Sequence, residues 1–325
     1  MLITRKLLEE GLSDLRDIAD LDIWEEDAPM PREELLRRIA DKDALISLLS
    51  DRIDRDVIDR AKGLKVIGNY AVGFDNVDVE HATSKGIPVL NTPSVLTEAT
   101  ADLTFALLMA AARRIAEGER LVRSGAFNSW GPTLLLGKDV WGATLGVVGA
   151  GKIGTAVLRR GKGFGMRLLY HSKPRNEEVE KELGAMYVPL EELLGSSDFV
   201  TLNVPLTAET RHLIGEKELA MMKRDAILIN TSRGPVVDEN ALSKALTERR
   251  IQAAALDVYE EEPKVHPWLL SIQNVVLAPH IGSATVTART NMAKLVASGV
   301  AAVLKGERPG NVVNPDVFKK GSDGR

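Results

Sequence analysis

The sequence predicts an α/β protein with two doubly wound domains, each a parallel sheet covered by helices on both faces. Between residues 144 and 279, apolar runs alternate with amphipathic, helix-like stretches; the runs are TLGVV, RLLYH, DFVTLN, AILIN, QAAALDV and NVVLAP. Nearly continuous apolar runs are typical of parallel strands that are buried on both faces. In the first part of the chain the shorter runs ALISLL, LKVIGNY and IPVL also alternate with helix-like segments. They predict a second, smaller sheet.

Two long helix-like segments separate these regions. EATADLTFALLMAAARR, residues 98–114, is apolar on most faces, and VTARTNMAKLVASGVAAVLKG spans residues 286–306. A chain of 325 residues is long enough for two domains with separate cores. We therefore predict one domain made of residues 1–98 and 287–325, into which a second domain, residues 99–286, is inserted. The first of these domains includes the polar tail KKGSDGR.

The composition excludes several classes of protein. Hydrophobic residues make up 44% of the chain and charged residues 27%, and the formal net charge is -4. This balance is typical of a globular protein and provides no basic stripe for nucleic acid. Cysteine is absent, which excludes disulfides, thiolate metal sites and cysteine nucleophiles. Without a secretory signal or a long apolar run, the sequence predicts a cytoplasmic protein that binds neither membrane nor nucleic acid nor metal.

A glycine pattern follows the first strand of the larger predicted sheet. In TLGVVGAGKIGTAV, Gly149, Gly151 and Gly154 form G-x-G-x-x-G between a strand and a helix. The first glycine permits a tight turn, the second lets a pyrophosphate approach the backbone, and the third lets helix and strand pack closely. Glycine-rich turns of this kind also arise from packing alone. Here the strand, the helix and the next strand stand in the expected order, so the pattern predicts a Rossmann-type dinucleotide site.

The next strand ends without the acidic residue that an NAD site would carry. RLLYH is followed by Ser172, Lys173, Pro174 and Arg175, at the position where a carboxylate would bind the adenosine ribose. Such a carboxylate would repel a 2′-phosphate, whereas a hydroxyl and two cations can bind one. The stretch therefore predicts NADP(H) as the preferred cofactor. NAD(H) stays open as the alternative, because Lys173 and Arg175 could be ordinary surface charges.

Three later strand ends carry side chains suited to acid–base chemistry. Arg233 follows AILIN, Glu262 follows QAAALDV, and His280 follows NVVLAP. Ligands of a doubly wound sheet bind beyond the carboxyl ends of its strands. Arg233 can clamp a carboxylate, His280 can exchange a proton with a carbonyl oxygen, and Glu262 can hold the imidazole. Each residue alone has a structural explanation, but together they indicate a site for a 2-keto acid.

With these residues in place, the chain resembles the D-isomer-specific 2-hydroxyacid dehydrogenases, most closely their glyoxylate/hydroxypyruvate reductase branch. The resemblance covers essentially the whole chain and rests on NYAVGFDNVD, GVVGAGKIG, INTSRGPVVDE, LDVYEEEP and LAPHIGSAT. It implies a flavodoxin-like substrate domain split by the Rossmann domain. It also implies NAD(P)-dependent reduction of glyoxylate or hydroxypyruvate to glycolate or D-glycerate. Ser172 departs from the family's acidic residue, which agrees with the branch that uses NADP(H).

The resemblance implies roles for individual residues. Arg233 would clamp the substrate, His280 would be the acid/base, and Glu262, directly before a proline, would be its partner. Val72 and Gly73 would offer their backbone amides to the substrate carboxylate. The implied substrate-binding residues are Leu49, Ser50, Val72, Gly73, Arg233 and His280. The implied cofactor-binding residues are Gly149, Ala150, Gly151, Lys152, Ile153, Gly154, Ser172, Lys173, Pro174, Arg175, Thr231, Ser232, Arg233, His280 and Gly282.

Two other functions stay open at this point. A phosphoglycerate dehydrogenase would need a basic phosphate-binding loop, which the sequence does not show. A corepressor-type module that senses dinucleotide could retain the same three residues.

The irregular segment SGAFNSWGPTLLLGKDVWG, residues 124–142, is long enough to suggest a function. Because the family packs this region on a partner subunit, we expect a homodimer; alternatively, Trp130 and Trp141 could belong to the local core.

Overall fold

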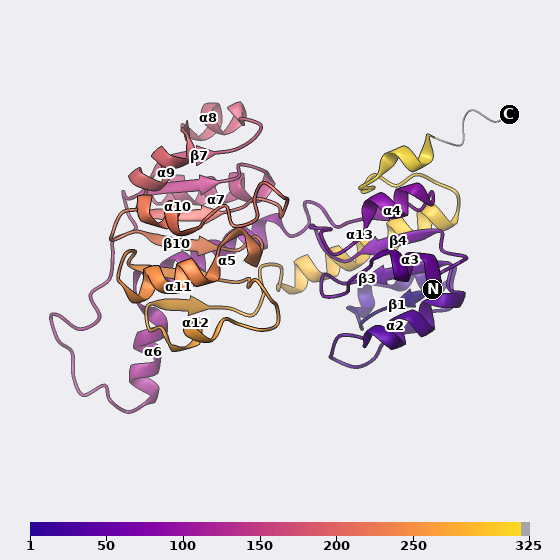
Figure 1. Cartoon of the computed structure of the whole chain (residues 1–325), viewed down its shortest axis with the longest axis horizontal. Coiled ribbons are helices and arrows are strands. Elements are labelled where there is room, and N and C mark those ends of the chain that lie inside the picture. Colours follow the sequence, from indigo (N-terminus) through magenta and orange to yellow (C-terminus); the bar gives the residue numbers. More distant parts are fainter. Residues whose placement is uncertain (320–325) are drawn as a thin grey trace. The chain divides into compact units, whose positions relative to one another are not determined.

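The computed structural model describes residues 1–319 as two compact units (Figure 1). Unit 1 consists of residues 1–96 and the C-terminal segment from residue 284, and unit 2 consists of residues 97–283. The chain passes from unit 1 to unit 2 after residue 96 and returns to unit 1 after residue 283. Each of these points lies a few residues before the boundary expected from the sequence. The first coincides with the start of α5 (Thr97–Ala112) and the second shortly precedes α13 (Val286–Leu304). Residues 320–325 of the predicted polar tail lie outside the described residues.

Unit 1 contains a five-stranded sheet in which every strand pair is parallel. The strand order is β2-β1-β3-β4-β5, the order of flavodoxin-like folds. The strands are β1 (Leu2–Ile3), β2 (Asp22–Ile23), β3 (Ala44–Ser47), β4 (Val66–Asn69) and β5 (Val89–Leu90).

Helices cover the sheet of unit 1. A buried core of Leu45, Ile67 and Val89 lies between the sheet and part of this helical cover, and α13 packs against β4 and η1. The other helical segments are η1 (Glu9–Gly11), α1 (Ser13–Arg16), α2 (Arg32–Arg38), η2 (Ile39–Asp41), α3 (Arg55–Arg60), α4 (Val79–Ser84) and η4 (Pro315–Phe318).

Unit 2 contains a seven-stranded parallel sheet. Its order, β12-β11-β10-β9-β6-β7-β8, is the Rossmann order with one further strand. The predicted fold class is therefore confirmed for both sheets. The strands are β6 (Thr144–Val148), β7 (Arg167–His171), β8 (Met186–Tyr187), β9 (Phe199–Leu202), β10 (Ile227–Asn230), β11 (Ala253–Leu256) and β12 (Val275–Leu277).

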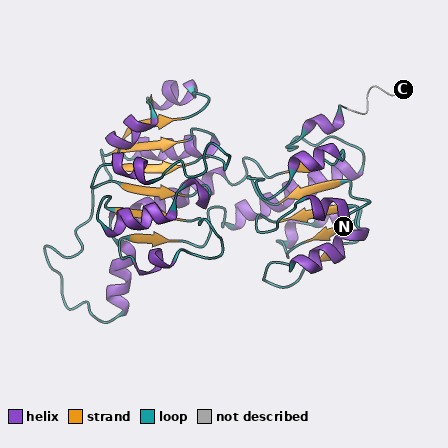
Figure 2. Cartoon of the chain, in the orientation of Figure 1, coloured by secondary structure: helices purple, strands orange, loops and turns teal. Residues whose placement is uncertain are grey.

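Both faces of this second sheet are buried, as its apolar runs predicted. Along β10, Ile227 and Ile229 enter one hydrophobic core and Leu228 enters the other, because successive side chains of a strand point to opposite faces. Figure 2 shows the helices that flank the strands. Besides α5, they are α6 (Ile115–Arg123), α7 (Lys152–Gly163), α8 (Glu177–Leu183), α9 (Leu190–Ser196), α10 (Glu216–Met221), η3 (Gly234–Val236), α11 (Glu239–Thr247) and α12 (Pro267–Ser271).

The two long predicted helices are slightly shorter than their sequence patterns. α5 ends at Ala112 because Arg114 has a φ of 53°, a left-handed conformation that cannot continue a right-handed helix. α13 ends at Leu304, shortly before Gly306, whose φ is 81°; glycine commonly ends helices in this way. Within residues 1–319, no helix has the length and apolar character needed to cross a membrane.

Candidate active site

The turns after β10 and β11 lie against each other in unit 2. Asn230 ends β10 and its side chain shapes the next turn: Oδ1 accepts from Ser232 N at 3.0 Å, and Nδ2 donates to Arg233 O at 2.9 Å. A Cβ on Gly234 would lie 1.8 Å from the carbonyl carbon of Tyr259. Only glycine permits this approach, which brings the loop of Arg233 beside the loop that carries Glu262.

Glu262 and His280 form a hydrogen-bonded pair beyond β11 and β12. His280 Nδ1 lies 2.7 Å from Glu262 Oε2, with side-chain exposures of 24% for His280 and 29% for Glu262. Tyr259 N donates to Glu262 Oε1 at 3.0 Å, so both carboxylate oxygens are engaged. A carboxylate on Nδ1 fixes the orientation of the ring and leaves Nε2 to exchange a proton with a ligand.

Tyr259 also connects the ends of β11 and β12. Its hydroxyl donates to Ala278 O at 2.8 Å, two residues before His280. Burial, together with the nearby carboxylates of Asp257 and Glu262, raises the pKa of Tyr259 to about 12. The phenol therefore stays protonated and continues to donate this bond at neutral pH.

Asp257, which was not among the predicted site residues, anchors the turn that carries His280. His280 has a φ of 54°, which costs a non-glycine residue on the order of 1–3 kcal/mol unless its surroundings hold it. The buried Asp257 carboxylate accepts from Ile281 N at 2.7 Å and Gly282 N at 2.8 Å. Burial raises the pKa of Asp257, opposed by these two donors and by His280. Its place at a strand end, in LDVYEEEP, was the signal available in the sequence.

The glycine turn is open on the side of Gly151. Gly149 has a φ of 92°, and a Cβ on Gly154 would lie 1.9 Å from Gly149 O. A Cβ on Gly151 would meet nothing within 4 Å, so this side of the turn has space for a ligand. Gly151 precedes α7, whose first turn holds no acidic side chain. These features fit an anion at the helix N-terminus; Lys152 and Ile153 begin that helix.

The end of β7 lies beside the glycine turn. Gly149 N donates to His171 O at 2.7 Å, and Asn176 Nδ2 donates to Ala150 O at 2.7 Å. The segment containing Ser172, Lys173 and Pro174 is thereby held next to the turn. Ser172 is partly buried, whereas Lys173 and Pro174 are exposed.

Arg175 is already engaged by a neighbouring carboxylate. Its Nε and Nη2 each donate to Glu180 at 2.6 Å, and its guanidinium lies 5.4 Å from the Tyr187 ring centroid. These hydrogen bonds lower the pKa of Glu180 to about 2 and raise that of Arg175. The sequence predicted that Arg175 either binds a phosphate or is an ordinary surface charge. Neither prediction included the pairing with Glu180, because Glu180 lies on α8, outside the motif.

The remaining predicted contacts of unit 2 lie at the same strand ends. Thr231 follows β10, and its hydroxyl is 2.8 Å from that of Thr104 on α5. Arg233 Nη1 donates to Ser232 O at 2.8 Å. Gly282 is held by the Asp257 carboxylate. Thr231 and Arg233 therefore lie in the turn after β10, and Gly282 lies in the turn that carries His280.

In unit 1, the predicted substrate contacts occupy loops after β3 and β4. Leu49 and Ser50 are exposed after β3. Val72 and Gly73 are partly buried after β4. Within residues 1–319, neither the Val72 N–H nor the Gly73 N–H has a protein acceptor. Two neighbouring unbonded N–H groups are a feature of anion-binding loops.

The four other histidines have separate partners, and His171 Nδ1 lies 3.1 Å from Val188 O. His81 pairs with Asp59 at 3.0 Å, His212 forms an ion pair with Glu260, and His266 Nε2 lies 3.1 Å from Asn240 Oδ1. Within residues 1–319, no group of three His, Cys, Asp or Glu side chains could hold a metal ion.

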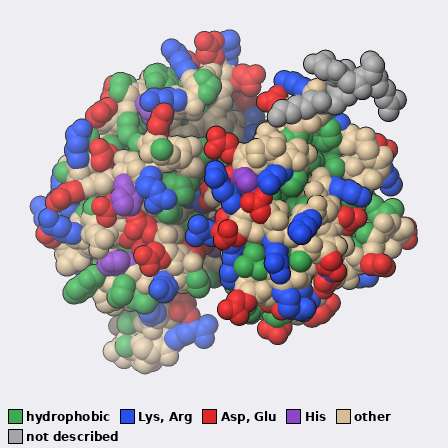
Figure 3. Space-filling view, turned by 45° about the vertical axis from the view of Figure 1, so that its right-hand side comes forward, with side chains coloured by type: hydrophobic (Ala, Val, Ile, Leu, Met, Phe, Trp, Pro, Cys, Tyr) green, Lys and Arg blue, Asp and Glu red, His purple; other side chains and the backbone are tan. Residues whose placement is uncertain are grey.

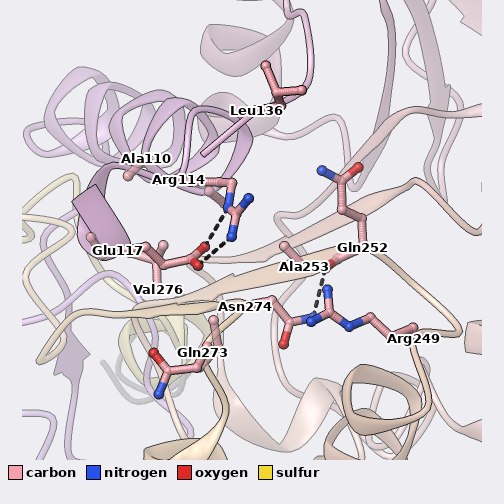
Figure 4. Close-up of a pocket in the computed structure, with 13 residues that line it drawn as sticks. Ala110, Arg114, Glu117, Leu136, Arg249, Gln252, Ala253, Gln273, Asn274 and Val276 are labelled. Carbon is pink, nitrogen blue, oxygen red and sulfur yellow. Dashed lines mark hydrogen bonds and ion pairs between the residues drawn. The ribbon is translucent and has the colours of Figure 1, made fainter. Parts of the chain in front are cut away.

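A pocket elsewhere in unit 2 contains none of the predicted site residues. It lies at the end of α5 and beside α6, where Arg114 pairs with Glu117 at 2.7 Å (Figure 4). Leu136 lines it as well and is 64% exposed. Trp130 and Trp141 of the same irregular segment are 80% and 75% exposed. The alternative that these two tryptophans form local core is therefore wrong.

Acidic and basic side chains are interspersed on the face seen in Figure 3, in agreement with the small net charge of -4. This face therefore presents no broad surface of a single charge.

Comparison with known proteins identifies the family. Residues 105–282 match the model of the D-isomer specific 2-hydroxyacid dehydrogenase NAD binding domain. The chain belongs to the D-isomer specific 2-hydroxyacid dehydrogenase family. It is 54% identical over 322 residues to a glyoxylate reductase of Korarchaeum cryptofilum, with 98% of this chain and 97% of the relative covered. The predicted family and its glyoxylate reductase branch are confirmed, and the chain is an NAD(P)-dependent D-2-hydroxyacid dehydrogenase that acts on small keto or hydroxy acids.

Two solved structures extend the comparison. The NADPH-dependent glyoxylate/hydroxypyruvate reductase of Sinorhizobium meliloti, in complex with NADP and malonate, has a TM-score of 0.85 and 32% identity. The match covers 96% of this chain and 95% of that one. D-Lactate dehydrogenase of Aquifex aeolicus, in complex with NAD and lactic acid, has a TM-score of 0.84 and 29% identity. That match covers 97% and 99% of the two chains.

Proposed function

We propose that this dehydrogenase reduces glyoxylate, and hydroxypyruvate as a second substrate, with NADPH as its preferred cofactor. The observation that carries the proposal is the His280–Glu262 pair, 2.7 Å apart at the strand ends beside the Arg233 loop. Glyoxylate reductase is also the name of the relative that is 54% identical over nearly the whole chain.

Each residue of the pair has a defined task in this mechanism. The bound nicotinamide supplies the hydride that the carbonyl carbon receives. His280 gives its Nε2 proton to the carbonyl oxygen, and Glu262 stabilises the protonated ring through Nδ1. Asp257 and Tyr259 hold the two loops so that the ring stays in place for the transfer.

Arg233 is proposed to bind the substrate carboxylate. Its guanidinium offers two parallel N–H donors, a geometry that matches a carboxylate and discriminates against substrates without one. Orientation of the keto acid then determines which face of the carbonyl is reduced; the family resemblance implies the D-hydroxy acid as product.

NADPH preference is proposed because no acidic residue directly follows β7. Ser172 and Lys173 stand at the position of the ribose-binding acid, and Arg175 lies nearby, although shared with Glu180. The Sinorhizobium meliloti reductase contains NADP, whereas the Aquifex aeolicus enzyme contains NAD. Because Glu180 offsets the charge of Arg175, we expect a preference for NADPH of about tenfold, with NADH still accepted.

Domain roles and assembly complete the proposal. Unit 2 is proposed to bind the cofactor and unit 1 to contribute substrate contacts. We also propose a homodimer through α6 and the following segment, because Ile115, Val122 and Leu136 are 56%, 60% and 64% exposed, an unusual apolar surface for a monomer.

A substrate panel tests the function. Initial rates with glyoxylate, hydroxypyruvate, pyruvate and 3-phosphohydroxypyruvate are measured with NADPH and with NADH through reduced-nicotinamide absorbance. We expect the highest catalytic efficiency for glyoxylate with NADPH. Absence of glyoxylate turnover with either cofactor would overturn the proposal, and a clear preference for the phosphorylated acid would favour the phosphoglycerate dehydrogenase alternative.

A further inference from the structure

The backbone carbonyls of the Val72–Gly73 loop are held by three donors of unit 1. Thr92 N donates to Ala71 O, the Asn91 side chain donates to Val72 O, and the Asn69 side chain donates to Gly73 O, each at 2.8 Å. The acceptors are successive carbonyls, and two of the donors are adjacent residues directly after β5. The loop is therefore fixed from one side through its C=O groups.

Fixing these carbonyls also fixes the direction of the amides. The peptide bonds of this loop are trans, since the cis bonds within residues 1–319 precede Pro174 and Pro263, and a trans peptide points its C=O and N–H to opposite sides. The Val72 N–H therefore points away from Thr92, and the Gly73 N–H points away from the Asn91 side chain. Both N–H groups lack a protein acceptor within residues 1–319.

We propose that Asn91 is a positioning residue for substrate binding: its side chain sets the direction of the Gly73 N–H, so that this amide and that of Val72 together bind the substrate carboxylate. This inference rests on the proposed function. A carbonyl that accepts a hydrogen bond also polarises its peptide, which strengthens the N–H of the same peptide as a donor. Asn91 thus aligns and strengthens one of the two donors without touching the substrate.

Asn91 is itself held firmly by the C-terminal segment. Its backbone N donates to Asn311 O at 3.2 Å, and its backbone O accepts from Asn311 Nδ2 at 2.8 Å. Asn91 and Val72 are only partly buried, so water can replace the lost donor if the side chain is removed. The side chain is therefore needed for amide direction more than for folding.

The experiment compares Asn91→Leu and Asn91→Asp with wild type. Leu removes the donor at similar size, and Asp replaces the donor with a carboxylate that repels Val72 O. We expect the KM for glyoxylate and the inhibition constant of oxamate, which carries the same carboxylate, to rise about tenfold for Leu and further for Asp. The KM for NADPH should change by less than about twofold. The change in kcat should be smaller than the change in the KM for glyoxylate.

Asn314→Asp is the matched control in the same unit. The Asn314 side chain is buried and holds Val89 N, Ile87 O and Thr83 Oγ1, so its loss should lower the Tm more than Asn91→Leu does. It makes none of the bonds to the Val72–Gly73 loop, and the KM for glyoxylate should stay at the wild-type value. If Asn314→Asp does not fold, Thr83→Val removes one of the same bonds.

The outcomes separate this inference from the proposed function. An unchanged KM for glyoxylate in both Asn91 variants would overturn the role of Asn91 while wild-type turnover keeps the function intact. An equal rise in KM in the control would also overturn it, because the effect would then follow from general destabilisation. Wild-type protein that fails to reduce glyoxylate would instead contradict the proposed function itself.

Discussion

Glu262→Gln should reduce turnover sharply while leaving the fold intact. In the structure one carboxylate oxygen accepts from Tyr259 N at 3.0 Å and the other faces His280 Nδ1 at 2.7 Å. Glutamine has one acceptor oxygen for these two donors. If the amide oxygen accepts from Tyr259 N, the NH2 group faces the Nδ1–H of His280; if the oxygen faces His280, the bond from Tyr259 N is lost. In both orientations the protonated ring loses its carboxylate.

The size of the effect follows from the hydrogen bond that is lost. A hydrogen bond to a charged group contributes about 1.5–3 kcal/mol. Exposures of 24% and 29% favour the lower part of this range because solvent screens the pair. A loss of about 1.5–2 kcal/mol corresponds to a fall in kcat of about tenfold to thirtyfold.

The assay is steady-state reduction of glyoxylate at saturating NADPH, with Glu261→Gln as control. Glu261 is the adjacent, exposed glutamate and should keep the wild-type kcat. If Glu262→Gln retains kcat within about twofold, or if the control loses as much, the carboxylate on Nδ1 does not support proton transfer and the reasoning is wrong.

Three further predictions concern the cofactor, the substrate and the acid stability of the fold. Ser172→Asp should lower catalytic efficiency with NADPH by about tenfold or more and spare NADH, because the new charge repels a 2′-phosphate; an unchanged ratio of the two efficiencies would contradict the cofactor assignment. Arg233→Lys should raise the KM for glyoxylate and lower kcat, since one ammonium cannot replace two parallel donors; wild-type kinetics would limit Arg233 to a structural role. Hydrogen bonds to arginines lower the pKa of Glu34 and Glu180 from 4.5 to about 2, so their stabilising contribution is complete above pH 4.5 and lost as the pH falls toward 2. The Tm should fall across that window, and the fall should be smaller in Glu180→Gln.

Much of the site was accessible from the sequence because it follows strand order. The glycine turn and the positions of Arg233, Glu262 and His280 are each set by a local motif directly after a strand. In a parallel sheet, residues at such positions share one edge. The topology therefore places them in the same region whatever the details of packing.

Other features depend on side-chain contacts that the motifs do not describe. Arg175 pairs with Glu180, whose carboxylate on α8 also accepts from the hydroxyl of Tyr170 on β7. The bond from Asn91 to Val72 joins two loops that follow neighbouring strands. The left-handed backbone of His280 is held by Asp257, whose place at a strand end in LDVYEEEP does not by itself reveal which backbone amides it binds. Side-chain pairing of this kind is set by tertiary structure rather than by sequence spacing.

The most direct test of the central claim is the turnover of His280→Ala with glyoxylate and NADPH, measured beside NADPH binding. His280 is the proposed proton donor, so its removal should lower kcat by roughly two to four orders of magnitude while the dissociation constant for NADPH stays close to the wild-type value. A variant that binds NADPH and retains kcat near the wild-type value would contradict the assignment of His280 as the acid of the reaction.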